Sequence, residues 1–198
     1  MNYIICILIG YILGNINAAY IISKLKGFDI RTMGSNNAGA SNATIIMGWK
    51  IGVTVAIIDI LKAYISVVIV KSIFPSLELA AIIAGTSCVI GHIFPIHMHF
   101  RGGKGLASYI GMILAIDWRV FVAFGLIIIL VTVVTNYTAL ATLTTVTVYP
   151  IYLYFINESI ISLIMLIIVA LIMYYKHISN IKRIISGKEV GLRKIKKT

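Results

Sequence analysis

Seven long apolar runs divide this sequence, and short polar segments separate them. Of its 198 residues, 60% are hydrophobic and only 12% are charged, which is about half the charged share of a soluble domain. A run of about 20 apolar residues can cross a bilayer as a helix, because the helix satisfies its own backbone polar groups. The sequence therefore predicts an all-α integral membrane protein with about seven transmembrane helices in one domain, 1–198. The runs are 3–23, 49–70, 78–98, 106–117, 119–135, 139–156 and 159–176, of which the fourth is short for a full span.

Basic residues gather at alternate ends of these runs. No basic residue precedes the first run, whereas Lys24 and Lys26 follow it, which predicts an outside N-terminus and a cytoplasmic C-terminus. The predicted outer turns then hold only two basic residues, Lys71 and Arg119. Topology and anionic lipid thus explain the net charge of +11, and no nucleic-acid partner is expected. The predicted inside segments hold Lys24, Lys26, Arg31, Lys50, Arg101, Lys104, Lys176, Lys182, Arg183, Lys188, Arg193, Lys194, Lys196 and Lys197.

The segment Phe100–Ala107 reads Phe-Arg-Gly-Gly-Lys-Gly-Leu-Ala and lies between two apolar runs. Glycine lets a backbone approach a ligand closely, and successive N–H groups beside a lysine form a cradle for an anion such as phosphate. Gly102, Gly103 and Gly105 are therefore candidate backbone donors. Lys104 is a candidate point charge for the same anion. A flexible turn between helices is the alternative, and the spacing does not match a nucleotide-binding P-loop.

A second polar segment, Gly34–Ala43, lies upstream and reads Gly-Ser-Asn-Asn-Ala-Gly-Ala-Ser-Asn-Ala. Serine and asparagine favour turns and helix caps, and they also bind polar ligands, so both interpretations remain open. Because both glycine-rich segments fall on the predicted cytoplasmic face, the pair favours a membrane protein that handles phosphorylated substrates. The candidate ligand contacts in this segment are Ser35, Asn37, Ser41 and Asn42.

Ionisable residues within the apolar runs are the next candidates. Asp59 and Lys62 lie three residues apart and so share a helix face, where they could form a structural ion pair or contact a substrate. His92 follows Gly91 and is expected to order a backbone carbonyl or the nearby loop, with substrate contact as a further possibility. No carboxylate lies near His92, His97 or His99 in the sequence, and a helix is expected to end at Pro95 before the last two, so no metal site is predicted.

Polar residues recur every three positions where the last run ends, at His177, Asn180 and Arg183. They could form the polar face of an amphipathic surface helix, or a stripe directed at the anion-binding segments. In the second case His177 could donate to a phosphate or relay a proton. The sequence holds no G-x-S-x-G motif, and no aspartate follows any histidine at the fifth position, so a covalent acyl-enzyme is not expected.

These segments, in this order, resemble the PlsY family of bacteria, the acyl-phosphate-dependent glycerol-3-phosphate acyltransferases. The resemblance covers nearly the whole chain, and the two glycine-rich motifs with the His-x-x-Asn tail are its most specific part. The matching segments are Gly10–Gly14, Asp29–Arg31, Gly34–Asn42, Asp59–Lys62, Gly91–Pro95, Phe100–Ala107 and His177–Arg183 with Gly187 and Glu189.

The resemblance implies a seven-helix enzyme of the cell membrane, without a cofactor and with its site on the cytoplasmic face. It would transfer a fatty acyl group from acyl phosphate to the first hydroxyl of glycerol 3-phosphate, giving lysophosphatidic acid and phosphate. We expect a monomer whose partners are these substrates and membrane lipids. The matched positions imply Ser35, Lys104, His177 and Asn180 as catalytic residues, and Asn37, Ser41, Asn42, Gly102, Gly103, Gly105, Thr142, Lys62, His92 and Arg183 as substrate contacts.

Several positions depart from the family pattern. Ile45 stands where the family usually has an arginine, and Asn17 replaces a common proline. In the segment 136–142, Asn136 and Ala139 replace an arginine and a serine, and Thr142 replaces a second serine. A paralogue with weakened activity or another acceptor is therefore an alternative. A transporter of a small organic phosphate is another, although the motifs gather at one face and no internal repeat is evident.

Overall fold

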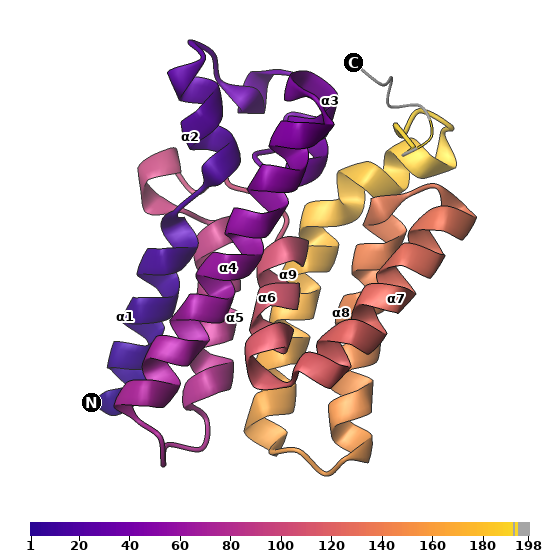
Figure 1. Cartoon of the computed structure of the whole chain (residues 1–198). Helices are drawn as coiled ribbons and strands as arrows, with labels where there is room; N and C mark the ends of the chain where they lie inside the picture. Colours follow the sequence, from indigo (N-terminus) through magenta and orange to yellow (C-terminus); the bar gives the residue numbers. More distant parts are fainter. Residues whose placement is uncertain (192, 194–198) are drawn as a thin grey trace. The chain divides into compact units, whose positions relative to one another are not determined.

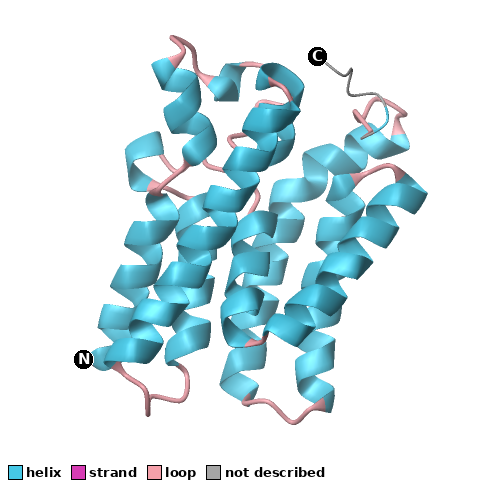
Figure 2. Cartoon of the chain, viewed as in Figure 1, coloured by secondary structure: helices cyan, strands magenta, loops and turns pink. Residues whose placement is uncertain are grey.

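The computed structural model describes residues 1–191 and 193, and it confirms the all-α prediction for this part of the chain. The described residues form helices, turns and loops without any strand (Figure 2). Six segments are long and apolar enough to cross a membrane, and the apolar helix over the fourth predicted run is shorter. The prediction that this run falls short of a full span is confirmed. Lys194, Lys196 and Lys197 of the predicted basic tail lie outside the described residues.

The chain forms two compact units, which meet in sequence after Trp118 (Figure 1). The second unit is built from three long helices, α7 (Trp118–Thr135), α8 (Thr138–Phe155) and α9 (Ile160–Ile185). The helices of the first unit are α1 (Asn2–Asn15), α2 (Ala18–Leu25), η1 (Ile30–Thr32), α3 (Ala40–Met47), α4 (Trp49–Ile73), α5 (Ala80–Ile93), η2 (Ile96–Met98) and α6 (Leu106–Ile116).

The first apolar run is not one helix but two, with a break at Ile16 and Asn17. Both residues have extended backbones, and the buried Asn17 caps α2 by accepting a hydrogen bond from the Tyr20 amide at 2.9 Å. The Asn17 side chain also donates to the carbonyl of Ala38 at 3.0 Å. The break is therefore fixed by a local cap and by a contact with a segment 21 residues away.

Close helix contacts in the first unit depend on glycine. A Cβ atom at Gly10 would overlap the Ala84 carbonyl, and one at Gly14 would overlap the Cys88 carbonyl. Thus α1 packs closely on α5, which lies beside it in Figure 1. Small residues permit such close packing between membrane helices.

A small hydrophobic core lies beneath the polar loops of the first unit. It joins α2, η1, α3, α4 and η2, and so connects the segments on both sides of the first loop with the segment that precedes the second. Because interiors are close-packed, this core holds both ends of the first loop and the start of the second in fixed positions. Its fully or nearly fully buried residues are Ala18, Ala19, Ile30, Ala38, Ala43, Val55 and Met98.

Candidate functional site

Asn42 organises the first polar loop. It is fully buried on α3, and its Oδ1 accepts a hydrogen bond from the Ser35 amide at 2.8 Å. Its Nδ2 donates to the carbonyls of Ile30, Met33 and Asn37 at 3.0, 3.0 and 2.9 Å. Both side-chain hydrogens are thus used inside the loop. Asn42, expected to contact substrate, instead serves as the internal support of the loop.

Three other candidates on this loop keep their polar atoms available. Ser35 and Asn37 are half-buried, and Ser41 is exposed on the first turn of α3. None of these three side chains makes a hydrogen bond within residues 1–191 and 193. The turn before Ser35 requires glycine, because Gly34 has a φ of +60° and a Cβ there would overlap the Asn42 side chain.

Arg31 joins the first loop to the second. Its guanidinium donates to both carboxylate oxygens of Asp29, and its Nη1 donates to the Met98 carbonyl at 2.8 Å. The same group lies over the Tyr20 ring, 4.7 Å from the centroid. These contacts hold the pKa of the Asp29 carboxyl well below its ordinary value, mainly through the hydrogen bond from Arg31 and against the effect of desolvation.

The second loop folds back on the end of α5. The Gly102 amide donates to the Ile93 carbonyl at 3.1 Å, and the Gly103 amide donates to the His92 carbonyl at 3.0 Å. These glycines therefore satisfy the last carbonyls of α5 rather than forming the expected anion cradle. A Cβ at Gly102 would overlap the His92 carbonyl, and one at Gly103 would overlap the His92 ring. Glycine is required here for close packing.

The end of this loop keeps the expected features of an anion site. Gly105 has a φ of +98° and occupies the N-cap of α6, next to the half-buried Lys104. Helix N-termini favour anions because several amides there have no partner within the helix. The structure thus confines the candidate cradle to the turn that starts α6, with Lys104 beside it.

Lys62 is buried among three acceptors. Its Nζ lies 2.7 Å from the Asp59 carboxylate, 2.6 Å from the Ile16 carbonyl and 2.8 Å from His92 Nδ1. The contacts to Ile16 and His92 are hydrogen bonds, and the contact to Asp59 is an ion pair between two buried side chains. Of the two interpretations left open by the sequence, the geometry supports the structural ion pair.

The histidines of α5 and η2 do not converge. His92 pairs with Lys62, whereas the His97 ring packs edge-on against Tyr20 at 6.1 Å between centroids. In the described part of the chain, no three histidine, cysteine or acidic side chains are placed to hold a metal ion.

In the second unit, His177 is a buried residue of α9 with a defined tautomer. Its Nδ1 lies 2.7 Å from the Met173 carbonyl, which can only accept a hydrogen bond, so Nδ1 carries the hydrogen. In the neutral ring, Nε2 is then the nitrogen that can take up a proton.

Glu189 connects the other two polar residues of this stripe. One of its oxygens accepts from Asn180 Nδ2 at 2.5 Å and the other accepts from Arg183 Nε at 2.6 Å. Gly187, with a φ of +68°, turns the chain so that Glu189 reaches back along α9. Glu189 was not expected to be a site residue, although a lone acidic residue in a basic tail was a usable signal.

Thr142 lies on α8 and is buried. Its hydroxyl donates to the Thr138 carbonyl of the same helix at 2.9 Å, which leaves the oxygen as an acceptor. Asn136 lies before α8, in the segment 136–142 that departs from the family pattern. It has a φ of +69° and accepts a hydrogen bond from the Arg193 amide at 2.9 Å.

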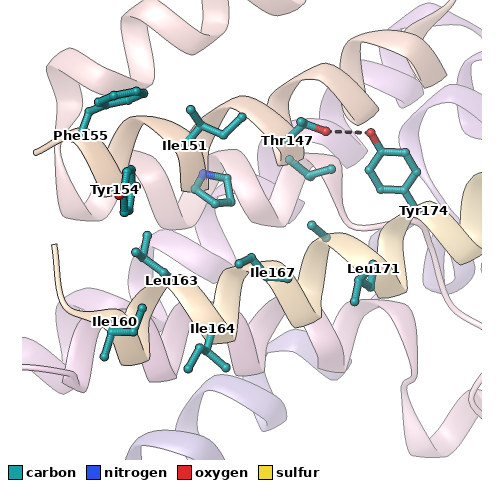
Figure 3. Close-up of a pocket in the computed structure, with 13 residues that line it drawn as sticks. Thr147, Ile151, Tyr154, Phe155, Ile160, Leu163, Ile164, Ile167, Leu171 and Tyr174 are labelled. Atoms are coloured by element: carbon teal, nitrogen blue, oxygen red, sulfur yellow. Dashed lines mark hydrogen bonds between the residues drawn. The ribbon is translucent and has the colours of Figure 1, made fainter. Parts of the chain in front are cut away.

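An apolar groove of about 540 Å³ lies between α8 and α9 (Figure 3). Its walls include Ile151, Ile164 and Leu171, which are half or more exposed. The hydroxyls of Thr147 and Tyr174 share a hydrogen bond of 2.7 Å near one end. The groove has the size of a small-molecule site and the lining of a hydrocarbon site.

Comparisons with known proteins agree with these features. The family model "Glycerol-3-phosphate acyltransferase" matches residues 4–187. Glycerol-3-phosphate acyltransferase 1 of Oceanobacillus iheyensis is 40% identical over 199 residues, covering 97% of this chain and 96% of its own. A crystal structure of PlsY, an integral membrane glycerol 3-phosphate acyltransferase, in its glycerol 3-phosphate form has a TM-score of 0.90 and 31% identity, covering 97% of this chain and 96% of its own. Its lysophosphatidic acid form has a TM-score of 0.85 and 30% identity, covering 96% and 95%. The chain belongs to the glycerol-3-phosphate acyltransferase family of integral membrane enzymes.

Proposed function

We propose that this membrane acyltransferase uses acyl phosphate as its donor and the sn-1 hydroxyl of glycerol 3-phosphate as its acceptor. In this reaction the hydroxyl oxygen bonds to the acyl carbon, and the bond between that carbon and the phosphate oxygen breaks. The hydroxyl proton is taken up overall by the departing phosphate. The products are lysophosphatidic acid and inorganic phosphate, which makes the reaction a first step of phospholipid synthesis.

The observation that carries this proposal is the pair of short polar loops, tied together by the bond from Arg31 to Met98. Two phosphate-bearing substrates need two anion sites. One loop presents Ser35 and Asn37, and the other presents Lys104 beside the start of α6. Acyl phosphate has a good leaving group, so positioning and charge neutralisation can supply much of the rate.

Within this proposal, Lys104 neutralises phosphate charge and Ser35 and Asn37 bind the polar substrate. His177 acts through Nε2 on the hydroxyl proton, and Asn180, oriented by Glu189, contributes a polar contact. Single alanine variants at Lys104 and His177, each with the fold retained, are expected to lose most of the activity.

The groove between α8 and α9 supports an acyl-chain site. The stretch of α9 from Ile160 to Tyr174 spans about 21 Å at 1.5 Å per residue. One leaflet of the hydrocarbon core is about 15 Å deep, so a long acyl chain fits the groove lengthwise. We expect Leu171→Trp, which narrows the groove, to lower kcat/KM for a long-chain donor and to leave a short-chain donor unaffected.

The proposal includes a monomer in the plasma membrane with the two loops on the cytoplasmic side. The charge distribution supports the cytoplasmic side, because Arg101 and Lys104 lie on the second loop and Arg31 lies just before the first. A reporter domain fused after residue 198 is expected to be active only in the cytoplasm.

The direct test uses the purified protein with glycerol 3-phosphate and follows phosphate release. Acyl phosphate should support turnover, whereas acyl-CoA and acyl carrier protein should not. Turnover with acyl-CoA and none with acyl phosphate would contradict the proposal. A different acceptor is the second candidate, favoured by Ile45 in place of the family arginine, and the same assay with other polyol phosphates addresses it.

A further inference from the structure

The contacts of Lys62 bear on the tautomer of the neighbouring His92 ring. Lys62 Nζ lies between Asp59, the Ile16 carbonyl and His92 Nδ1, all within 2.8 Å, and its side chain is 3% exposed. Beside a protonated lysine, which only donates hydrogen bonds, His92 Nδ1 accepts one, and the ring is then neutral with its hydrogen on Nε2. The Asp59 carboxylate lies farther from the same Nδ1, at 3.4 Å, and its charge is compensated by Lys62 at 2.7 Å.

The Nε2 edge of this ring lies against the second loop. A Cβ built on Gly103 would overlap His92 Nε2, and the Gly103 amide donates to the His92 carbonyl at 3.0 Å. The orientation of the ring thus sets the space available to the backbone just before Lys104. Any change in the partner of Nδ1 alters the surface on which this loop rests.

The same ammonium group also reaches the root of the first loop. Its bond to Ile16 lies at the break between α1 and α2, and the next residue, Asn17, donates to the Ala38 carbonyl at 3.0 Å. Ala38 directly follows Asn37 in the first loop. A single buried cation therefore contacts a residue at the base of each polar loop.

We propose that Lys62 is a positioning residue which fixes the two loops relative to each other, and that Asp59 compensates its charge. The kinetic part of this inference rests on the proposed function, because the loops are there the two phosphate sites. Lys62 acts through His92 and Ile16 and does not touch substrate.

The test removes both charges together, as Asp59→Leu with Lys62→Met. Replacing a buried ion pair by apolar residues preserves folding far better than removing one partner. Ser66→Ala is the matched control, since Ser66 is buried on the same helix, where its hydroxyl donates to the Ala63 carbonyl at 2.8 Å and also lies within hydrogen-bond reach of Cys88. Nitrogen-15 NMR of histidine-labelled protein in lipid nanodiscs, with the His92 signal assigned through His92→Gln, reports the tautomer.

In the parent and in Ser66→Ala, the His92 ring should be neutral with its hydrogen on Nε2. In the double variant, His92 should be a mixture of the two neutral tautomers. The double variant should raise the KM for glycerol 3-phosphate about tenfold, the scale of one charge-assisted hydrogen bond. An imidazolium or Nδ1–H ring at His92 in the parent would overturn the inference, as would a folded double variant with parental tautomer and KM. A parent inactive with acyl phosphate would refute the proposed donor, and the tautomer measurement would still decide the role of Lys62.

Discussion

Replacing Asn42 by alanine tests whether the first loop is held from within. The substitution removes four hydrogen bonds, one accepted from Ser35 and three donated to loop carbonyls. Two hydrogens serve the three carbonyls, so the loss amounts to three full bonds at about 1 kcal/mol each, or about 3 kcal/mol. At 2–4 °C per kcal/mol for a protein of this size, the unfolding temperature should fall by about 6–12 °C.

Asn37→Ala is the matched control, because it makes the same chemical deletion five residues away. The Asn37 side chain makes no hydrogen bond within the described residues, so its loss should leave the unfolding temperature nearly unchanged. Both variants should lose activity, Asn42→Ala because the loop loosens and Asn37→Ala because a substrate contact is lost. Thermal unfolding in detergent and phosphate release are measured on the same samples. An Asn42→Ala protein as stable as the parent, or an equal loss in Asn37→Ala, would refute the reasoning.

Three further outcomes follow from the site. Lys104→Ala should fold normally and lose about 10- to 150-fold in kcat/KM, the equivalent of one charge-assisted contact of about 1.5–3 kcal/mol, so normal kinetics would remove Lys104 from the site. Ile45→Arg, which places a guanidinium one helical turn from Ser41, should lower the KM for glycerol 3-phosphate about tenfold; an unchanged KM would show that position 45 does not contact phosphate. Arg31 lowers the pKa of Asp29 in the folded protein. The folded state is therefore stabilised above the ordinary carboxyl pKa of about 3.9, and this stabilisation is lost as the pH falls below that value. The unfolding temperature should then fall more steeply in acid for the parent than for Asp29→Asn.

The helices could be predicted because their signal is local. Apolar length and flanking charge located every membrane helix and the short fourth run. The pair of Asp59 and Lys62 was also accessible, since three-residue spacing places both on one face. In contrast, the first run was predicted as one helix, and the segment that begins α3 was predicted as a loop. The break at Asn17 depends on Ala38, a partner 21 residues away that no local pattern reveals.

The sequence indicated which residues belong to the candidate site better than it indicated which contacts they make. The sequence identified the glycines at 102 and 103 and the asparagine at 42, but not that their polar groups are used within the protein. A glycine that presents amides to phosphate and a glycine that packs against a helix end look alike in sequence. Glu189 was missed for the same reason, because its role depends on hydrogen bonds from Asn180 and Arg183, which only the turn at Gly187 brings within reach.

The shortness of α6 has a consequence for where polar groups can lie in the membrane. Its 11 residues extend only about 16 Å, against a hydrocarbon core of about 30 Å. Lys104 precedes this helix and Asp117 follows it, so two polar ends lie closer together than two headgroup layers. All residues of α6 are buried or half-buried, because the helix packs against α4 and α5. Protein rather than lipid therefore surrounds the shortened span, and a polar end can lie below the headgroups without the bilayer thinning around it.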